Sequence, residues 1–167
     1  EEMRERLEQG LNITVHDIYG LSEIMGPGVA ADCSHHLGNH IFEDHFLPEI
    51  LDPTTLENLP PGEIGELTIT TLTKEALPLI RFRTKDLTSI DYTTCDCGRT
   101  MARVARFTGR SDDMLIIRGV NVFPSQIEAA LLSMGDTTPH YHIEVDRVND
   151  QDVFIVHVEV DASFFSE

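Results

Sequence analysis

Positively charged residues are scarce in this sequence. Among 167 residues there are 12 lysines and arginines against 29 aspartates and glutamates, a formal net charge of −17. Phosphate backbones and anionic lipid headgroups repel a chain of that charge. Nucleic acid and membrane surfaces are therefore excluded as expected partners, and small-molecule ligands are expected instead. No pattern in the sequence indicates the oligomeric state.

Long hydrophobic runs are also missing. Apolar stretches such as residues 114–117 and 153–156 are short, and no basic segment precedes an apolar core as in a signal peptide. This excludes a transmembrane chain and predicts a globular, cytoplasmic one, with 41% hydrophobic and 25% charged residues. The chain opens without methionine and closes without a terminating signal, so we expect a piece of a longer protein.

Cysteine is rare, with only three residues, Cys33, Cys95 and Cys97. An odd number in a cytoplasmic chain argues against a disulfide framework and favours metal binding or free thiols. One residue separates Cys95 from Cys97, a spacing that lets two thiolates reach one metal ion. Together with His40, the three thiolates would complete the ligand set of a structural zinc ion.

Two alternatives to that ligand set stay open. His35 and His36 are further candidates for the fourth ligand, since both lie between Cys33 and His40. Without a metal, Cys33 would be a small buried apolar residue and the other two cysteines would lie in an ordinary turn.

Periodicity and turn residues predict an α+β chain in two parts. The first, residues 1–108, has a helix over 1–9 ended by Gly10, and then β-rich runs at 13–19, 40–51, 65–72 and 79–90. The second, residues 109–167, begins at a polar break. It contains strands at 114–117 and 120–123, a helix at 124–134, and strands near 140–148 and 152–160. This small α+β domain looks incomplete at residue 167.

Three stretches carry residue types that phosphoryl chemistry uses. Tyr19-Gly20-Leu21-Ser22-Glu23 offers a ring that can stack on a base and a carboxylate that can hold magnesium. Arg81-Phe82-Arg83-Thr84-Lys85-Asp86 joins three cations to an acid able to accept hydrogen bonds from ribose. Gly109-Arg110-Ser111-Asp112-Asp113 adds an arginine at a flexible junction. Singly, each could be a turn, a solvated strand or a linker; together they favour phosphoryl chemistry.

The order and the residue patterns of these stretches resemble those of the adenylate-forming superfamily, most closely the phenylacetate-CoA ligases. The three resemble its Tyr-Gly-x-Thr/Ser-Glu, Tyr-Arg-Thr-Gly-Asp and Gly-Arg-x-Asp elements. The resemblance extends over about residues 15–132 and includes the runs DIYGLSEIMGPG (17–28), EDHFLPEILDP (43–53), GELTITTLTK (65–74) and GRSDDMLIIRGVNVFPSQIE (109–128). Lys85 departs from the pattern, because the superfamily usually has glycine there.

The resemblance implies the β-rich part of a large AMP-binding domain, followed by a mobile C-terminal domain. It implies ATP-dependent activation of an aryl-acetic acid to an acyl-adenylate, and then acyl transfer to coenzyme A. Tyr19 would lie against adenine, with Gly20 and Ser22 in the same binding element, and Glu23 would ligate Mg²⁺. Asp86 would hold the ribose hydroxyls, and Arg110 would reach the ribose or phosphate.

The resemblance also assigns roles to residues away from the nucleotide. Asp112 would be the hinge of the small domain, and Gly119 would flank the pantetheine tunnel. The backbone of Ile24, Met25, Gly26 and Pro27 would line the aryl pocket. Family members tend to carry a Cys/His cluster, which favours Zn²⁺ at Cys33, His40, Cys95 and Cys97.

Two parts of the superfamily's machinery have no counterpart in the sequence. No glycine- and Ser/Thr-rich phosphate loop precedes Tyr19, and the only lysines, Lys74 and Lys85, lie ahead of the hinge. A late lysine stabilises charge in the adenylation transition state, so we expect no adenylation by this chain alone. The alternatives are a ligase for another aryl acid, a carrier-protein adenylation domain, and a non-catalytic zinc-stabilised β module that binds a nucleotide or partner.

Overall fold

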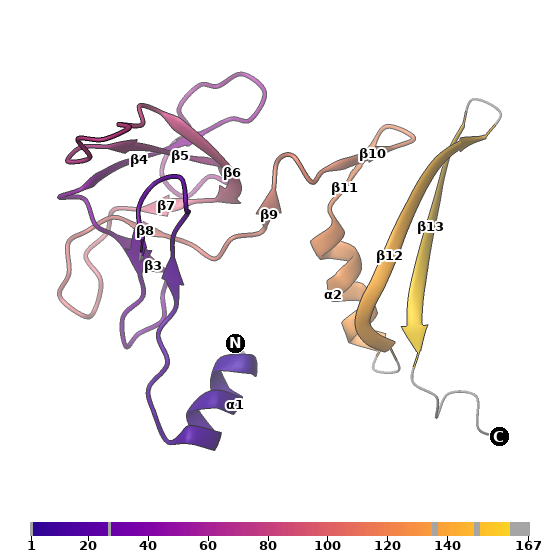
Figure 1. The fold of residues 1–167 in the computed structure, drawn as a ribbon, viewed down its shortest axis with the longest axis horizontal. Coiled ribbons are helices and arrows are strands. Elements are labelled where there is room, and N and C mark those ends of the chain that lie inside the picture. The colour runs from indigo at the N-terminus through magenta and orange to yellow at the C-terminus, as the bar shows by residue number, and fades with distance from the viewer. Residues whose placement is uncertain (1, 27, 135–136, 149–150, 161–167) are drawn as a thin grey trace. The chain divides into compact units, whose positions relative to one another are not determined.

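The computed structural model describes residues 2–26, 28–134, 137–148 and 151–160. The chain divides into two compact units, Glu1–Phe107 and Thr108–Glu167 (Figure 1). Many short strands and few helices confirm the predicted β-rich α+β class. Within the described residues, no helix is long and apolar enough to cross a membrane.

Two antiparallel sheets build the first unit. One has the order β1-β2-β3-β8-β7, formed by Ile18–Tyr19, Ala30–Ala31, Asn39–Ile41, Arg103–Val104 and Ile90–Asp91. In the other, β5 (Gly65–Thr71) lies between β4 (Phe46–Leu51) and β6 (Phe82–Thr88). Both sheets contribute to one core, which contains Ile41 and Val104 from the first and Phe46, Leu67 and Ile69 from the second.

The second sheet is tightly packed because β5 is almost entirely buried. Its residues 65–69 and 71 are all buried. A Cβ at Gly65 would lie 2.5 Å from the carbonyl oxygen of Leu51 on β4. Only glycine lets the two backbones approach this closely.

Helix α1 (Glu2–Leu11) extends past the predicted end at Gly10. Asn12 takes the left-handed conformation that ends the helix, with φ at 53°, and its N–H donates to the Glu8 carbonyl at 2.9 Å. Asparagine tolerates this conformation better than most residues, which explains why it replaces glycine as the cap.

Three predicted β runs are shorter than expected or divided, and one of them, the run at 79–90, forms β6 and β7. The run at 13–19 forms a strand only at Ile18–Tyr19, and the run at 40–51 divides into β3 and β4. A turn causes that division, since the N–H groups of His45 and Phe46 both donate to the Phe42 carbonyl.

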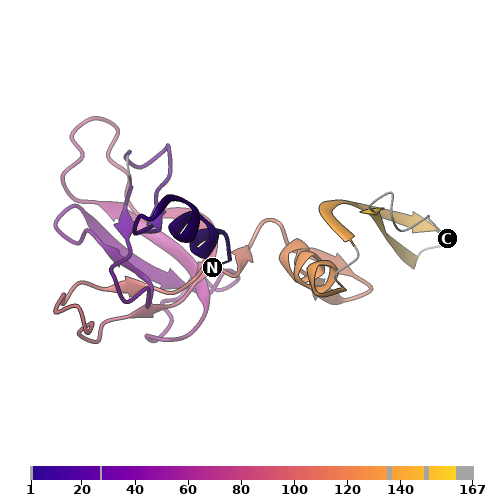
Figure 2. The same ribbon diagram turned by 90° about the horizontal axis from the view of Figure 1, so that it is seen from below.

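The second unit contains β9 (Gly109–Arg110), β10 (Leu115–Ile117), β11 (Val120–Val122), α2 (Pro124–Met134), β12 (Thr137–Val148) and β13 (Gln151–Val160). Arg118 and Gly119 connect β10 to β11 with φ angles of 51° and 80°, as a type I′ hairpin turn requires. Helix α2 has the predicted bounds, with proline at its first position. It lies along β12 in both views (Figure 2), and the Tyr141 hydroxyl donates to the Pro124 carbonyl at 3.2 Å. The last two strands begin slightly earlier than predicted.

Candidate functional site

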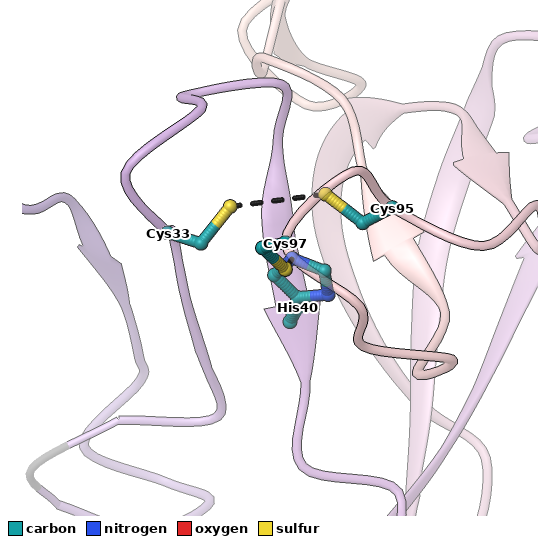
Figure 3. Close-up of side chains that lie close together, drawn as sticks. All are labelled: Cys33, His40, Cys95 and Cys97. Atoms are coloured by element: carbon teal, nitrogen blue, oxygen red, sulfur yellow. Dashed lines mark hydrogen bonds between the residues drawn. The ribbon is translucent and has the colours of Figure 1, made fainter.

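Four side chains of types that can ligate a metal converge in the first unit. The ligand atoms of Cys33, His40, Cys95 and Cys97 all lie within 4.8 Å of one another (Figure 3). The Sγ atoms of Cys33 and Cys95 are 3.8 Å apart, and Cys97 Sγ is 3.6 Å from His40 Nε2. Tetrahedral zinc with ordinary bond lengths requires separations of about 3.8 Å between two sulfurs and about 3.5 Å between sulfur and nitrogen. These two separations therefore match those of a tetrahedral zinc site.

Sheet topology closes the long sequence gap between the halves of this cluster. Cys33 follows β2 and His40 lies in β3, whereas the other two cysteines lie in the β7–β8 loop. Strand β8 pairs with both β3 and β7, and Arg103 is opposite His40 on one side and Asp91 on the other. The loop therefore returns beside β3.

The pKa shifts of His40 and Cys97 suit metal binding, whereas the shift of Cys33 opposes it. Burial lowers the pKa of His40, and the charge of Arg99 lowers it further, so the imidazole is neutral at physiological pH. Burial raises the pKa of the Cys33 thiol, whereas a hydrogen bond with the Arg99 backbone lowers the pKa of Cys97. Neutral imidazole and thiolate are the forms that ligate zinc.

The two alternative histidines lie elsewhere. His35 is exposed, and the His36 ring contacts the Asp32 carboxylate. The geometry therefore favours His40 as the partner of the three thiols.

A second contact joins two of the three stretches that carry residue types used in phosphoryl chemistry. The Tyr19 hydroxyl, from β1, donates to Asp86 Oδ2, from β6, at 2.6 Å. The Tyr19 ring also stacks on Phe107, with ring centroids 4.3 Å apart. Sequence reasoning missed Phe107, whose only signal is an aromatic residue just before the domain boundary.

A bulge in β6 presents Asp86. Thr68 pairs with Arg83 and Glu66 pairs with Leu87, so two steps along β5 match four along β6. Lys85, inside this bulge, has a φ of 70°. The backbone at residue 85 adopts the left-handed conformation that glycine favours, which explains why the superfamily usually has glycine at this position.

A buried carboxylate anchors the bulge. Glu66 has no exposed surface. Its two oxygens accept hydrogen bonds from Arg83 at 2.6 and 2.8 Å, and the Lys85 ammonium lies 3.7 Å away. The sequence analysis did not single out Glu66, because a lone glutamate on an apolar strand carries no motif.

The segment after Tyr19 is mostly exposed. Gly20, Ser22, Glu23, Met25 and Gly26 are exposed, and the Glu23 carbonyl accepts a hydrogen bond from Lys74 Nζ at 2.8 Å. The Ile24 side chain is buried in the core, so only its backbone could face a substrate. Pro27 lies outside the described residues.

The predicted residues of the second unit are partly brought together. Arg110 Nε and Nη2 donate to the two carboxylate oxygens of Asp112, each at 3.0 Å. Gly119 lies in the exposed β10–β11 turn.

The first unit also has a hollow of about 530 Å³. Tyr19 and Phe107 line it, together with residues that follow β2 and β8. Among its described lining residues are neither Glu23 nor Asp86. The hollow is therefore not the nucleotide site that the motifs predict, although Tyr19 borders both.

Comparison with known proteins gives relatives along the whole chain. The chain is 52% identical over 168 aligned residues to the phenylacetate-coenzyme A ligase of Thermus thermophilus, covering 100% of this chain and 38% of that protein. It is 54% identical over 162 residues to the phenylacetate-coenzyme A ligase of Escherichia coli K12, covering 96% and 36%. Residues 119–167 match the AMP-binding enzyme C-terminal domain.

A solved structure is similar in fold as well. The 2-hydroxyisobutyryl-CoA ligase in its postadenylation state has a TM-score of 0.78 and 31% identity, over 96% of this chain and 34% of that one. The chain thus spans little more than a third of the proteins that it matches.

Proposed function

We propose that this chain, which belongs with the phenylacetate-coenzyme A ligases among the adenylate-forming enzymes, is the C-terminal part of an ATP-dependent aryl-acid–CoA ligase. The overall reaction would convert phenylacetate, ATP and coenzyme A to phenylacetyl-CoA, AMP and diphosphate through an acyl-adenylate. The observation that carries the proposal is the contact of Tyr19 with Asp86, since it unites two separate nucleotide-binding elements. ATP and coenzyme A also suit the cytoplasmic location expected from the sequence.

Asp86 is the residue proposed to bind the ribose. Its bulge is anchored from below by Glu66, and its carboxylate already accepts one hydroxyl donor, from Tyr19. Two ribose hydroxyls would be donors of the same kind. Because Phe107 covers one face of the Tyr19 ring, an adenine stacked on Tyr19 would use the opposite face.

The remaining roles follow the family's motifs. Glu23 has an exposed carboxylate suited to Mg²⁺, which when bound would neutralise phosphate charge. Arg110 would reach the ribose or phosphate, and its guanidinium pairs with the Asp112 carboxylate. Asp112 is the proposed hinge, and Gly119 the proposed neighbour of pantetheine.

The nucleotide proposal is tested by Asp86→Ala in the full-length enzyme. Charge-assisted hydrogen bonds to two hydroxyls contribute about 1.5–3 kcal/mol. We therefore expect the Michaelis constant for ATP to rise roughly ten- to a hundredfold, at 1.4 kcal/mol per decade. Glu23→Gln should instead depress turnover more than ATP affinity.

The matched control is Asp44→Ala, because Asp44 is an exposed aspartate whose carboxylate lies 3.3 Å from His45. It should leave both constants unchanged. A folded Asp86→Ala enzyme with unaltered ATP affinity would refute the assigned role. Assaying phenylacetate, other aryl acids and 2-hydroxyisobutyrate in parallel would identify the acid.

We further propose that Cys33, His40, Cys95 and Cys97 bind one structural Zn²⁺. The donor set and its spacings support this, and the ion would tie the β2–β3 segment to the β7–β8 loop. Metal that binds only the folded state stabilises it by about 2.7 kcal/mol at a hundred times its dissociation constant. Chelation should lower the melting temperature by roughly 5–10 °C.

Elemental analysis and two variants test the ligand set. Protein purified without chelator should contain one equivalent of zinc in this site, and Cys33→Ser should lose it. His35→Ala is the matched control, since His35 is a neighbouring but exposed histidine. Unchanged zinc in Cys33→Ser would show that the ligand set is wrong.

A further inference from the structure

A second cluster of metal-type donors lies next to the cysteine cluster in sequence but uses different residues. The donor atoms of His16, Asp32 and His36 are all within 4.8 Å of one another. His16 Nδ1 is 2.8 Å from Asp32 Oδ1, and His36 Nδ1 contacts Asp32 Oδ2. We propose that these three side chains form a second site, for a divalent first-row transition metal ion such as Zn²⁺.

The backbone holds the three donors in place. Strands β1 and β2 pair with Ile18 opposite Ala31, and the Asp32 N–H donates to the Asp17 carbonyl at 2.9 Å. That bond sets Asp32 beside His16. On the other side, the His36 N–H donates to the Cys33 carbonyl at 3.0 Å, which closes a turn that brings His36 back to Asp32. A site whose ligands are positioned by strand pairing and a turn is pre-organised.

The donor chemistry fits such an ion. The Asp32 side chain is only 3% exposed, whereas the His16 and His36 side chains are 46% and 21% exposed. A buried carboxylate needs a charged or hydrogen-bonding partner, and here both oxygens face imidazole nitrogens. Two imidazoles and one carboxylate form a common set of ligands for zinc and iron. Tetrahedral zinc with bonds of 2.0–2.1 Å holds its nitrogen and oxygen ligands about 3.3–3.4 Å apart, so the 2.8 Å between His16 Nδ1 and Asp32 Oδ1 would lengthen when the metal replaces the hydrogen bond.

The hollow gives the site access from outside. Asp32 and His36 are among its lining residues, and three protein ligands leave coordination positions for water or another small ligand. Arg4, Arg106 and Asp17 line it too. The hollow is thus of mixed charge, and the three donors, rather than a general negative potential, would select the cation.

The test is metal titration of the intact, metal-free protein with Co²⁺ and with Zn²⁺. Bound Co²⁺ with thiolate ligands shows sulfur-to-metal charge-transfer absorption, whereas Co²⁺ at nitrogen and oxygen ligands does not. We expect one equivalent that lacks this absorption, in addition to any held by the cysteines. His16→Ala and His36→Ala should each weaken that equivalent at least tenfold, since loss of a mere outer-shell partner already costs about 10–100-fold. The thiolate absorption should stay unchanged.

The matched control is His157→Ala. His157 also lies beside a carboxylate, Glu144 at 2.9 Å, but both side chains are about half exposed. This variant should bind both ions as the wild type does. If His36→Ala fails to fold, the test uses His16→Gln instead, because His16 is exposed and its replacement should not disturb the fold. The proposal is overturned if the wild-type protein binds no equivalent of Co²⁺ that lacks thiolate absorption, or if the His16 variants still bind that equivalent. Either result would show that the three side chains form only a hydrogen-bonded cluster.

Discussion

Asp91 shows what a single side chain contributes in the first unit. Its carboxylate accepts hydrogen bonds from the Thr93 N–H and hydroxyl at 2.8 and 2.9 Å and pairs with Arg103. The hydrogen bonds from Thr93 hold the pKa of Asp91 below its ordinary value, and Arg103 lowers it further. The folded protein therefore stabilises the ionised form of Asp91 more than its protonated form.

That lowered pKa has a defined pH dependence. The stabilisation is fully present above the unfolded pKa, near 3.9, and is lost as the pH falls through the lower pKa of the folded state. Asp91→Asn should reduce the free energy of unfolding by about 1 kcal/mol at pH 7, because the side chain is half exposed. The difference from wild type should shrink below about pH 4. Urea titrations between pH 7 and pH 3 measure it, and a constant difference would contradict the assignment.

At the scale of elements, the bulge in β6 combines a backbone cost with the gain of an ion pair. Lys85 has a left-handed backbone, which costs a non-glycine residue about 1 kcal/mol. Its ammonium gains an ion pair with buried Glu66. Lys85→Gly removes both, and we expect the free energy of unfolding to change by less than about 1 kcal/mol.

Glu66→Gln should behave quite differently. It removes the charge that compensates Arg83 and Lys85, and breaking a buried pair costs about 3–5 kcal/mol. Because Arg83 is about one-third exposed, we expect the lower end, about 3 kcal/mol. Denaturation of both variants by urea gives the comparison. Equal losses would show that the bulge does not depend on Glu66.

At the scale of the whole molecule, the division after Phe107 suggests a moving part. We propose that the hinge lies at Asp112, an exposed residue of the polar run 109–113 that follows the division between the units. In the full-length enzyme, Asp112→Pro should slow one half-reaction at least tenfold more than the other, because a fixed φ prevents rotation. Separate assays of adenylate formation and thioester formation measure this.

Asp112→Ala is the control for that experiment. It also breaks the ion pair with Arg110, but it leaves φ free. A hinge at this residue requires the alanine variant to retain the balance between half-reactions that the proline variant loses. Equal losses in both half-reactions for Asp112→Pro would count against it.

Local patterns alone determined much of this protein. The bounds of α2, the strand β5 and the resemblance to a family follow from neighbouring residues, because periodicity, a proline start and contiguous motifs all lie within short stretches. The four-residue cysteine and histidine cluster was predicted from residue type. The sequence named His40 as the fourth ligand but left His35 and His36 open, since the choice depends on which ring the β2–β3 segment turns toward the β7–β8 loop.

Tertiary structure decided every contact between distant segments. Tyr19 meets Asp86 because β1 and β6 belong to two sheets with a common core. Lys85 occupies a glycine-type position because buried Glu66 lies beneath it. His16, Asp32 and His36 converge only because β1 pairs with β2 and a turn follows. Sequence spacing does not predict these contacts, because strand pairing joins residues whose separation along the chain is arbitrary.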